Sequence, residues 1–535
     1  MATFNLGDLF DICADAAPDR IALVWDEQHL TFRELRERSD RLAAALLRRG
    51  IRRGDTVGLL MYNSPAYVDS LLAAFKIGAI PFNINYRYEA DELFYILDDA
   101  RVTALVHGEE FEPVVAHLLE RLPGLRLRVV VDAGDTPARL GANSIAFRAA
   151  LAEPVGSTDI ASGRSDDDRL LLYTGGTTGK PKGVEWSHRA KFFGVLGGGA
   201  MFGASAPVAT PEQMTERVGL MPMTVLALSP LMHGASMWST LMTLLNGQTT
   251  VLKRSRSFNA ELAWDLVERE KVSTLMFTGD AMAGPLIDAL DANPGRWDLS
   301  SLLAVSWGGA PLSPFLQAAF KERFPYAFLL SGLGSSEGGI VGSGNLDTGG
   351  DGFMQLPPRE DLAVIVDGTR FAEPGETGIL SRTGHLPNGY WNAPEKTAET
   401  FITLDGRRWV LTGDQVRLNA DGSMNLFGRG STSINSGGEK IYPEEVEAVI
   451  RSHPQVFDAL VVGIPDPRWG ETVAAVVALR AGATLTLQEL QDYCTGKLAR
   501  YKLPRRLVLQ DSVQRSPAAK ADYAWAKKVI AAAQQ

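Results

Sequence analysis

Cysteine is scarce in this chain, with Cys13 and Cys494 the only two among 535 residues. Two cysteines so far apart give neither a disulfide framework nor the closely spaced ligands of a structural metal site. The sequence therefore excludes a fold held together by disulfides or by cysteine-bound metal.

Positive charge is limited too. Lysine and arginine number 53 against 63 aspartates and glutamates, so the formal net charge is −10. Proteins that bind nucleic acids through their phosphates need a basic face. The composition therefore argues against a nucleic-acid partner.

The chain also lacks a secretory leader and a clean membrane-spanning run. Residues 1–10 contain Asp8 and show no basic, apolar or cleavage pattern of a signal peptide. No charged residue lies between Arg217 and Lys253, but prolines, glycines and His233 interrupt this stretch before about 20 apolar residues accumulate. We expect a cytoplasmic protein without a transmembrane segment; peripheral contact with a membrane and homodimer formation stay open.

The order of the expected elements predicts an α/β protein with two domains. A chain of this length with 45% hydrophobic residues can bury a large core. Apolar runs alternate with helical patterns through residues 56–330, which predicts doubly wound, mostly parallel sheets. Short strands with hairpin turns follow, and a small α+β set begins at Tyr442. We place a large N-terminal domain with a short-strand β subdomain at 1–428, and a small mobile C-terminal domain at 429–535.

The segment from Tyr173 to Val184 follows a short apolar run and is rich in glycine, threonine and lysine. Glycines let the backbone turn its N–H groups inward as an anion nest, and hydroxyls and ammonium groups add donors and charge. The residues expected to contact a polyphosphate are Thr174, Gly175, Gly176, Thr177, Thr178, Gly179, Lys180 and Lys182. The segment is not a Walker loop, because Thr174 and Pro181 stand where that pattern needs glycine and a hydroxyl residue. A flexible surface turn is the alternative interpretation.

Six segments at wide spacing, the phosphate segment first among them, carry residues suited to one chemistry. The others are Trp307–Pro311, Leu333–Glu337, Trp409–Asp414, Ser436–Pro443 and Arg515–Lys520. Each alone is also typical of a turn or a solvated helix face. In this order they resemble the adenylate-forming superfamily of acyl- and aryl-CoA synthetases, peptide-synthetase adenylation domains and luciferases. The resemblance covers essentially the whole chain and implies an enzyme that activates a carboxylic acid with ATP and Mg²⁺ and transfers it to coenzyme A.

The resemblance also implies roles for individual residues. On the nucleotide, it places Gly308, Gly309, Ala310, Pro311, Leu333, Gly334, Ser335 and Ser336 beside the adenine and the α-phosphate, and Asp414 and Arg429 on the ribose. In catalysis, it assigns Mg²⁺ to Glu337 and Thr177, the reacting carboxylate and α-phosphate to Lys520, and the entrance of the acyl pocket to His233. In the second half of the reaction, it implies a hinge at Ser431 and a path for the CoA thiol along Gly437 and Gly438.

The sequence departs from the family pattern at four positions, which are Gly176, Leu333, Ser431 and Ala519. Leu333 replaces an aromatic residue that often stacks on adenine, so we expect modestly weaker nucleotide binding or stacking elsewhere. Ser431 stands where aspartate or lysine is usual, and its hinge role is inferred from its position.

The class of carboxylic acid is suggested by an apolar region, residues 221–245, and by the small residues Gly279, Ala281 and Gly308, which together predict a roomy apolar pocket. Residues 389–391, 466–471 and 515–517 look like those of bacterial fatty-acid and sterol-side-chain CoA ligases. We favour a medium-to-long, branched or polycyclic aliphatic acid. The alternatives are an acyl-AMP ligase that loads a carrier protein, an aryl-CoA ligase, and a non-catalytic nucleotide- or lipid-binding relative.

Overall fold

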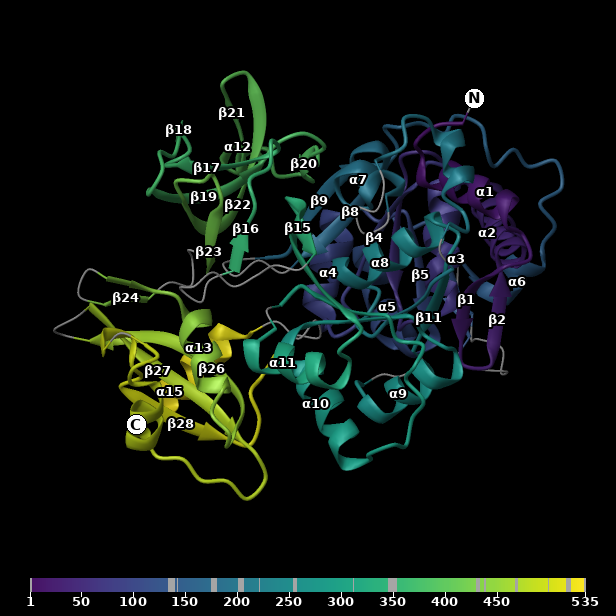
Figure 1. Cartoon of the computed structure of the whole chain (residues 1–535). Helices are drawn as coiled ribbons and strands as arrows, with labels where there is room; N and C mark the ends of the chain where they lie inside the picture. The colour runs from purple at the N-terminus through teal and green to yellow at the C-terminus, as the bar shows by residue number, and fades with distance from the viewer. Residues whose placement is uncertain are drawn as a thin grey trace.

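The computed structural model describes residues 2–132, 140–141, 143–174, 180–200, 206–220, 222–253, 257–310, 312–344, 354–429, 434–436, 439–466, 470–498, 500–515 and 521–533. Two eight-stranded sheets form the large N-terminal domain, coloured purple to teal in Figure 1. A smaller β subdomain and the C-terminal domain, green and yellow, lie together on one side of it (Figure 1).

The first large sheet has the strand order β15-β14-β13-β12-β10-β11-β1-β2. Its strands are β1 (Ile21–Trp25), β2 (Gln28–Thr31), β10 (Thr224–Ala227), β11 (Thr249–Leu252), β12 (Thr274–Phe277), β13 (Ala304–Gly308), β14 (Phe328–Ser335) and β15 (Gly339–Gly344). All neighbours are parallel except the two edge pairs, β1 with β2 and β14 with β15.

The second large sheet has the order β20-β9-β8-β4-β3-β5-β6-β7. Its strands are β3 (Thr56–Leu60), β4 (Ile80–Asn83), β5 (Ala104–Gly108), β6 (Leu127–Val131), β7 (Ser144–Ala146), β8 (Arg169–Thr174), β9 (Lys182–Ser187) and β20 (Gly389–Tyr390). Only β9 pairs antiparallel, with β8 on one side and β20 on the other. The predicted doubly wound, mostly parallel architecture is confirmed.

Helices of the large domain follow the strands as the alternating pattern predicts. They are α1 (Leu6–Ala16), α2 (Phe32–Arg48), α3 (Pro65–Lys76), α4 (Ala90–Asp99), α5 (Glu112–Leu118), α6 (Phe147–Ala152), α7 (His188–Gly194), α8 (Gly234–Leu245), α9 (Ala260–Arg269), α10 (Gly279–Ala292) and α11 (Pro314–Arg323). Thr31 and Glu34 form the capping box that starts α2. Every residue of α3 is buried, because α1 and α2 also pack on it. Such a helix, enclosed on all sides, belongs to the core.

The β subdomain is antiparallel throughout. Its elements are β16 (Met354–Leu356), β17 (Leu362–Val366), β18 (Arg370–Phe371), β19 (Thr377–Arg382), α12 (Pro394–Thr400), β21 (Phe401–Leu404), β22 (Arg407–Leu418) and β23 (Met424–Arg429). The hairpin between β22 and β23 closes at residues 419–422, where Asn419 N donates to Ser423 O at 2.8 Å. Its strand β20 leaves this sheet and joins the second large sheet instead.

The C-terminal domain is a small α+β unit with its own core. Its elements are β24 (Ile434–Ser436), β25 (Glu439–Ile441), α13 (Pro443–Arg451), β26 (Val456–Asp466), β27 (Gly470–Leu479), α14 (Leu487–Cys494), β28 (Arg506–Gln510) and α15 (Tyr523–Ala532). α13 and α15 both pack on β26, and each contributes to a separate apolar cluster.

Two of the segments named in the sequence analysis are parts of strands. Leu333, Gly334 and Ser335 belong to β14, which continues through Ser335 and pairs with β15. Likewise Thr412, Gly413 and Asp414 lie inside β22, not in a simple turn. In both cases glycines lower the strand propensity of the segment, while the neighbouring strand supplies the hydrogen bonds that extend it.

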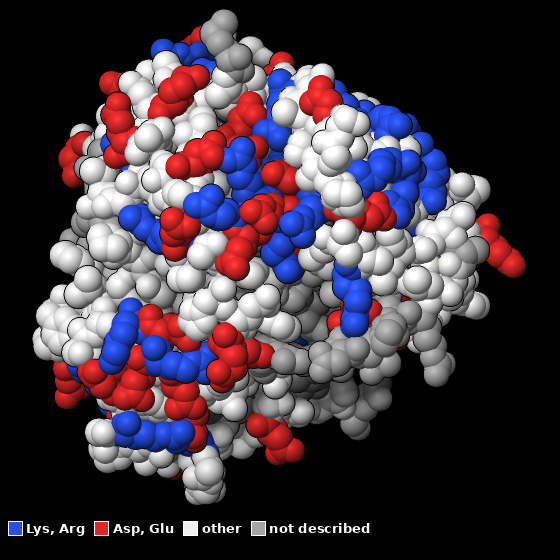
Figure 2. All heavy atoms as spheres, turned by 90° about the vertical axis from the view of Figure 1, so that its right-hand side faces the viewer, with Lys and Arg blue, Asp and Glu red and all other residues white. Residues whose placement is uncertain are grey.

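Charged side chains of both signs share the surface. Arg33 pairs with Asp19 at 2.9 Å, and Arg48 pairs with Glu153 at 2.8 Å. Figure 2 shows acidic and basic side chains interspersed over most of one face of the molecule. Within the described part of the chain, no helix combines the length and the apolar character that crossing a membrane requires.

Candidate active site

The phosphate segment connects the ends of β8 and β9. Residues 175–179, which include Gly175, Gly176, Thr177, Thr178 and Gly179, lie outside the described residues. Thr174 pairs with Lys182 and Tyr173 with Gly183, so the segment is the loop of an antiparallel hairpin. A β-carbon on Gly183 would lie 2.9 Å from Tyr173 Cζ, which leaves glycine as the residue that fits under this ring.

The hydroxyl group of Tyr173, the tyrosine before the loop, is fixed by a hydrogen bond. Tyr173 Oη donates to Asp99 Oδ2 at 2.6 Å. Burial and the neighbouring Asp99 carboxylate raise the pKa of Tyr173, so the phenol stays protonated and remains the donor. This contact anchors the end of β8 to the last residue of α4.

The two lysines after the loop diverge. Lys180 Nζ lies 4.7 Å from the centroid of the Tyr95 ring on α4, and Lys182 Nζ lies 5.7 Å from that of Tyr390. Tyr95 Oη also donates to Pro181 O at 3.0 Å. Cations are attracted to the faces of aromatic rings, so each lysine has a preferred direction even without a nucleotide. Tyr390, the ring beside Lys182, also contacts Glu337.

Glu337 lies in the turn between β14 and β15. Trp186 Nε1 on β9 donates to Ser336 O at 2.9 Å, and Gly338 N donates to Ser335 Oγ at 2.8 Å. Tyr390 Oη donates to Glu337 Oε1 at 2.9 Å. The turn and its carboxylate are therefore held from the backbone and from the side chain.

A buried arginine supports the same turn from beneath. Arg382 Nη1 donates to Gly338 O at 2.6 Å and to Gly194 O, at the end of α7, at 2.8 Å. Its Nε lies 3.3 Å from Asp361 Oδ2. Burial lowers the pKa of Arg382. Through this side chain, the β subdomain, α7 and the Glu337 turn are joined.

Glycines line a surface where β13 ends beside β14. Gly308 pairs with Gly332 in the parallel ladder, and a β-carbon on Gly308 would lie 3.2 Å from Gly332 O. Gly309 follows with φ of 79°. Ala310 comes next, and Pro311 lies outside the described residues. Such a surface at the carboxyl end of parallel strands suits a planar ring.

The predicted nucleotide-binding residues Leu333 and Asp414 lie in β14 and β22. Leu333 packs on the apolar cluster of the β subdomain, which includes Val341 and Leu380. Asp414 N donates to Thr412 Oγ1 at 3.2 Å, and Asp414 pairs with Arg429 in the ladder of β22 and β23. The predicted ribose-binding pair thus comes from two neighbouring strands of one sheet.

The segment that carries His233 is fixed by two asparagines that sequence reasoning missed. Asn63 Oδ1 accepts from Leu231 N at 2.7 Å, and Asn83 Nδ2 donates to Met232 O at 2.7 Å. Asn83 also receives Tyr173 N on Oδ1 at 2.7 Å and donates to Tyr173 O at 2.9 Å. One buried amide therefore joins the strand before the phosphate loop to the segment before α8, where His233 is the N-cap. No local pattern distinguishes such an asparagine from one in a turn.

Of the two predicted Mg²⁺ ligands, Glu337 lies among the described residues. Among the described residues, no three His, Cys, Asp or Glu side chains gather as a metal cluster. Mg²⁺ usually keeps several waters and is held by one or two carboxylates together with substrate phosphates. Glu337, a single oriented carboxylate next to the phosphate hairpin, fits that requirement. Thr177, the second predicted ligand, is outside the described residues.

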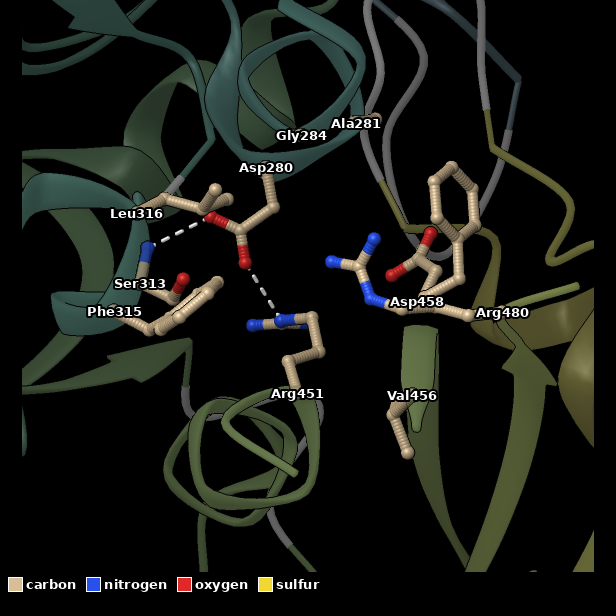
Figure 3. Close-up of a pocket in the computed structure, with 11 residues that line it drawn as sticks. Asp280, Ala281, Gly284, Ser313, Phe315, Leu316, Arg451, Val456, Asp458 and Arg480 are labelled. Carbon is tan, nitrogen blue, oxygen red and sulfur yellow. Dashed lines mark hydrogen bonds and ion pairs between the residues drawn. The ribbon is translucent and has the colours of Figure 1, made fainter. Parts of the chain in front are cut away.

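An ion pair docks the C-terminal domain on the large domain (Figure 3). Arg451 Nε, at the end of α13, lies 2.7 Å from Asp280 Oδ2 on α10, and Asp280 Oδ1 accepts from Ser313 N at 2.7 Å. Arg480 and Asp288 form a second pair at 3.2 Å. Asp280, Ser313, Arg451 and Arg480 line a cavity of about 30 Å³ between the domains. Ala281, which sequence analysis assigned to the acyl pocket, lines this interdomain cavity.

Glu444 is a titratable group at the interface between the domains. Burial, with the carboxylates of Glu447 and Asp414 nearby, raises the pKa of Glu444 to about 7. A β-carbon on Gly428 would lie 2.9 Å from Glu444 Oε2, so α13 packs directly against the end of β23. Because the carboxyl binds its proton more tightly here than in water, protonation below pH 7 favours this arrangement.

Lys520, the lysine predicted to act on the acid, lies outside the described residues, as do Ser431, Gly437 and Gly438. Its flanking residues Arg515 and Ala521 form an isolated β-bridge. Arg515 Nη2 pairs at 2.6 Å with Asp458 Oδ1, and Asp458 lines the interdomain cavity. Both ends of the segment that carries Lys520 are therefore held together on the side of the C-terminal domain that faces the large domain.

Comparison with known proteins agrees with this organisation. The family model described as AMP-binding enzyme matches residues 10–391, and that of the AMP-binding enzyme C-terminal domain matches 445–520. The chain belongs to the AMP-binding enzyme family.

Several relatives of this AMP-binding enzyme are named ligases. A medium/long-chain-fatty-acid–CoA/3-oxocholest-4-en-26-oate–CoA ligase from Mycobacterium marinum is 41% identical over 98% of this chain and 96% of its own. A 3-oxocholest-4-en-26-oate–CoA ligase from Rhodococcus rhodochrous is 40% identical over 98% of this chain and 95% of its own. An anthranilate CoA ligase solved with anthranoyl-AMP has a TM-score of 0.85 and 25% identity, covering 100% of this chain and 99% of its own.

The first prediction concerns Asn83→Ala. The substitution leaves three buried backbone groups without their partner, so we expect a loss on the order of 3 kcal/mol in the free energy of unfolding. Displacement of the phosphate hairpin lowers acid-dependent ATP–pyrophosphate exchange about 10²-fold. Urea unfolding and the exchange assay measure the two effects. Asn293→Ala, which removes one bond to Ala289 O, is the control; equal losses in both variants would contradict the role of Asn83.

The second prediction concerns Asp280→Asn. Removing the carboxylate leaves Arg451 half-paired in a buried place, which typically costs about 3–5 kcal/mol, so we expect a smaller population of the docked arrangement. Because Cys13 and Cys494 are buried, spin labels can be attached to cysteines introduced at the exposed positions 322 and 488, and their distance distribution measured.

The control is Asp291→Asn, on the same helix, whose partner Arg323 belongs to the large domain. Wild type and this control should share one dominant distance, and Asp280→Asn should broaden it. Identical distributions in all three proteins would show that the ion pair does not govern docking.

Proposed function

We propose that this AMP-binding enzyme is an AMP-forming acyl-CoA ligase. It converts a carboxylic acid, ATP and CoA into acyl-CoA, AMP and pyrophosphate through an acyl-adenylate. The observation that carries the proposal is the convergence of the phosphate hairpin, the Glu337 turn and the glycine surface at one edge of the large domain. Full-length similarity to ligases that act on fatty acids and a steroid acid supports it.

In the first step, an oxygen of the substrate carboxylate attacks the α-phosphorus of ATP and the bond to pyrophosphate breaks. Lys182 and the loop before it neutralise the phosphates, and Glu337 would hold Mg²⁺, which supplies further neutralisation when bound. The glycines of β13 and β14 receive the adenine, and Asp414 with Arg429 receives the ribose. Lys520 stabilises the charge that develops between the carboxylate and the α-phosphate.

In the second step, the sulfur of CoA attacks the carbonyl carbon of the acyl-adenylate. The thiol gives its proton to solvent, the C–O bond to AMP breaks, and AMP leaves with the electron pair. For this step the C-terminal domain turns about Ser431, which withdraws Lys520 and brings Gly437 and Gly438 to the thiol path. The Arg451–Asp280 pair belongs to the arrangement before this turn, because it holds the Lys520 side of the domain against α10.

The acid is a medium-to-long aliphatic or polycyclic one. α8, which follows His233, buries Met237, Leu241 and Leu244 in the main apolar cluster. No charged residue lies in residues 218–252 to bind an amino-acid ammonium group. Relatives named for fatty acids and for 3-oxocholest-4-en-26-oate favour the same class.

A panel of acids tests the proposed function. We expect pyrophosphate release with dodecanoate, hexadecanoate and a steroid side-chain carboxylic acid, much less with benzoate, and thioester formation with CoA. Transfer to a phosphopantetheinyl carrier protein but not to CoA would identify the carrier protein as the acceptor. Release of neither pyrophosphate nor AMP with any hydrophobic acid would refute the proposal.

A further prediction separates the two steps. In Lys520→Ala, the acyl-adenylate should fail to form, with a loss of about 10²–10³-fold or more, while thioester formation from supplied acyl-AMP should stay near wild type. Stopped assays of each half-reaction measure this. Lys528→Ala, an exposed lysine on α15, is the control; equal loss of both half-reactions in Lys520→Ala would contradict the two-arrangement mechanism.

A further inference from the structure

We infer that Tyr390 is a positioning residue that fixes the Glu337 carboxylate and links it to Lys182. The inference rests on the proposed function and adds a residue to its site. Tyr390 Oη donates to Glu337 Oε1 at 2.9 Å, and both side chains are partly buried. A hydrogen bond to an ionised acceptor is about twice as strong as a neutral one.

The single phenolic hydrogen selects one orientation of the carboxylate. The bond to Oε1 resists rotation of the carboxylate, and in the inferred site Oε2 is the oxygen that a metal ion would use. Outer partners of this kind orient metal-binding carboxylates, and their removal commonly costs about 10–100-fold in metal affinity.

Tyr390 is itself rigid, which is a requirement for positioning. Its strand β20 pairs with β9, where Tyr390 lies opposite Val184, and Trp391 N donates to Gly183 O at 2.8 Å. Tyr390 N donates to Thr397 Oγ1 at 2.9 Å. The ring packs edge-on against Phe401 with a centroid distance of 6.0 Å. Backbone and ring are therefore fixed independently of the hydroxyl.

The same ring faces the phosphate hairpin. Lys182 Nζ lies 5.7 Å from its centroid, and Lys182 is the first residue of β9. The electron-rich face attracts the ammonium group while the hydroxyl at the edge of the ring binds the carboxylate. One tyrosine therefore sets the separation between a phosphate-binding cation and a metal-binding anion.

Tyr390→Phe tests the inference, since it removes the hydroxyl and keeps the ring that packs on Phe401. Binding of Mn²⁺, in place of Mg²⁺, is measured by electron paramagnetic resonance with α,β-methylene-ATP, which cannot release pyrophosphate. We expect Mn²⁺ affinity to fall about 10-fold or more, while binding of the metal-free nucleotide and the thermal unfolding midpoint stay close to wild type. Tyr493→Phe, whose hydroxyl donates to Ser452 O within the C-terminal domain, is the matched control.

The double variant decides whether the effect passes through Glu337. In the Glu337→Gln background, Tyr390→Phe should cause little further loss of Mn²⁺ affinity, because the group it positions is gone. Unchanged Mn²⁺ affinity in the single variant, or an equal loss in both backgrounds, would overturn the inference. Failure of the proposed function is distinct: the wild type would then adenylate no acid, whatever its Mn²⁺ affinity.

Discussion

The antiparallel pairing of β9 with β8 on one side and β20 on the other is the constraint on which the site depends. The pairing with β8 closes the phosphate hairpin, and the pairing with β20 brings in Tyr390. Within β9 itself, Lys182 faces Tyr390 and Trp186 holds the backbone beside Glu337. A shift of one residue in the pairing register of β9 would turn these side chains to the opposite face of the sheet. The register of one short strand therefore fixes the distances among the parts of the site.

Buried amides connect the two large sheets where their strands end. β4 stops at Asn83 while β8 continues to Thr174, so Tyr173 would lack a partner for its backbone on that side. The Asn83 side chain supplies both a donor and an acceptor there and uses its second N–H on Met232 O. A buried backbone group without a hydrogen-bond partner destabilises the folded state. The Asn83 side chain supplies these partners and so connects the phosphate loop to the segment that carries His233.

Two ion pairs cross the interface between the domains, beside apolar side chains such as Phe315 and Val456. Desolvation offsets much of the attraction in a buried ion pair, so the Arg451–Asp280 pair contributes orientation more than net stability. Such a pair suits the proposed turn of the C-terminal domain, because its two groups find water or other partners once separated. A large apolar interface would instead oppose that proposed turn.

The local sequence determined the alternation of strands and helices, the phosphate hairpin and the order of the segments, because these depend on composition and spacing within a few residues. The local sequence could not predict that β14 extends through Leu333–Ser335, because the hydrogen bonds that extend it come from β15. Nor could it place Ala281 at the interdomain cavity or assign Asn63, Asn83 and Arg451, whose partners lie far along the chain. Tyr390 was visible as part of a Gly-Tyr-Trp sequence, but its contact with Glu337 exists only once β20 has joined β9. Sequence by itself set which chemistry the chain can carry; tertiary pairing decided which groups meet, because contacts between distant segments depend on register and packing that no local pattern encodes.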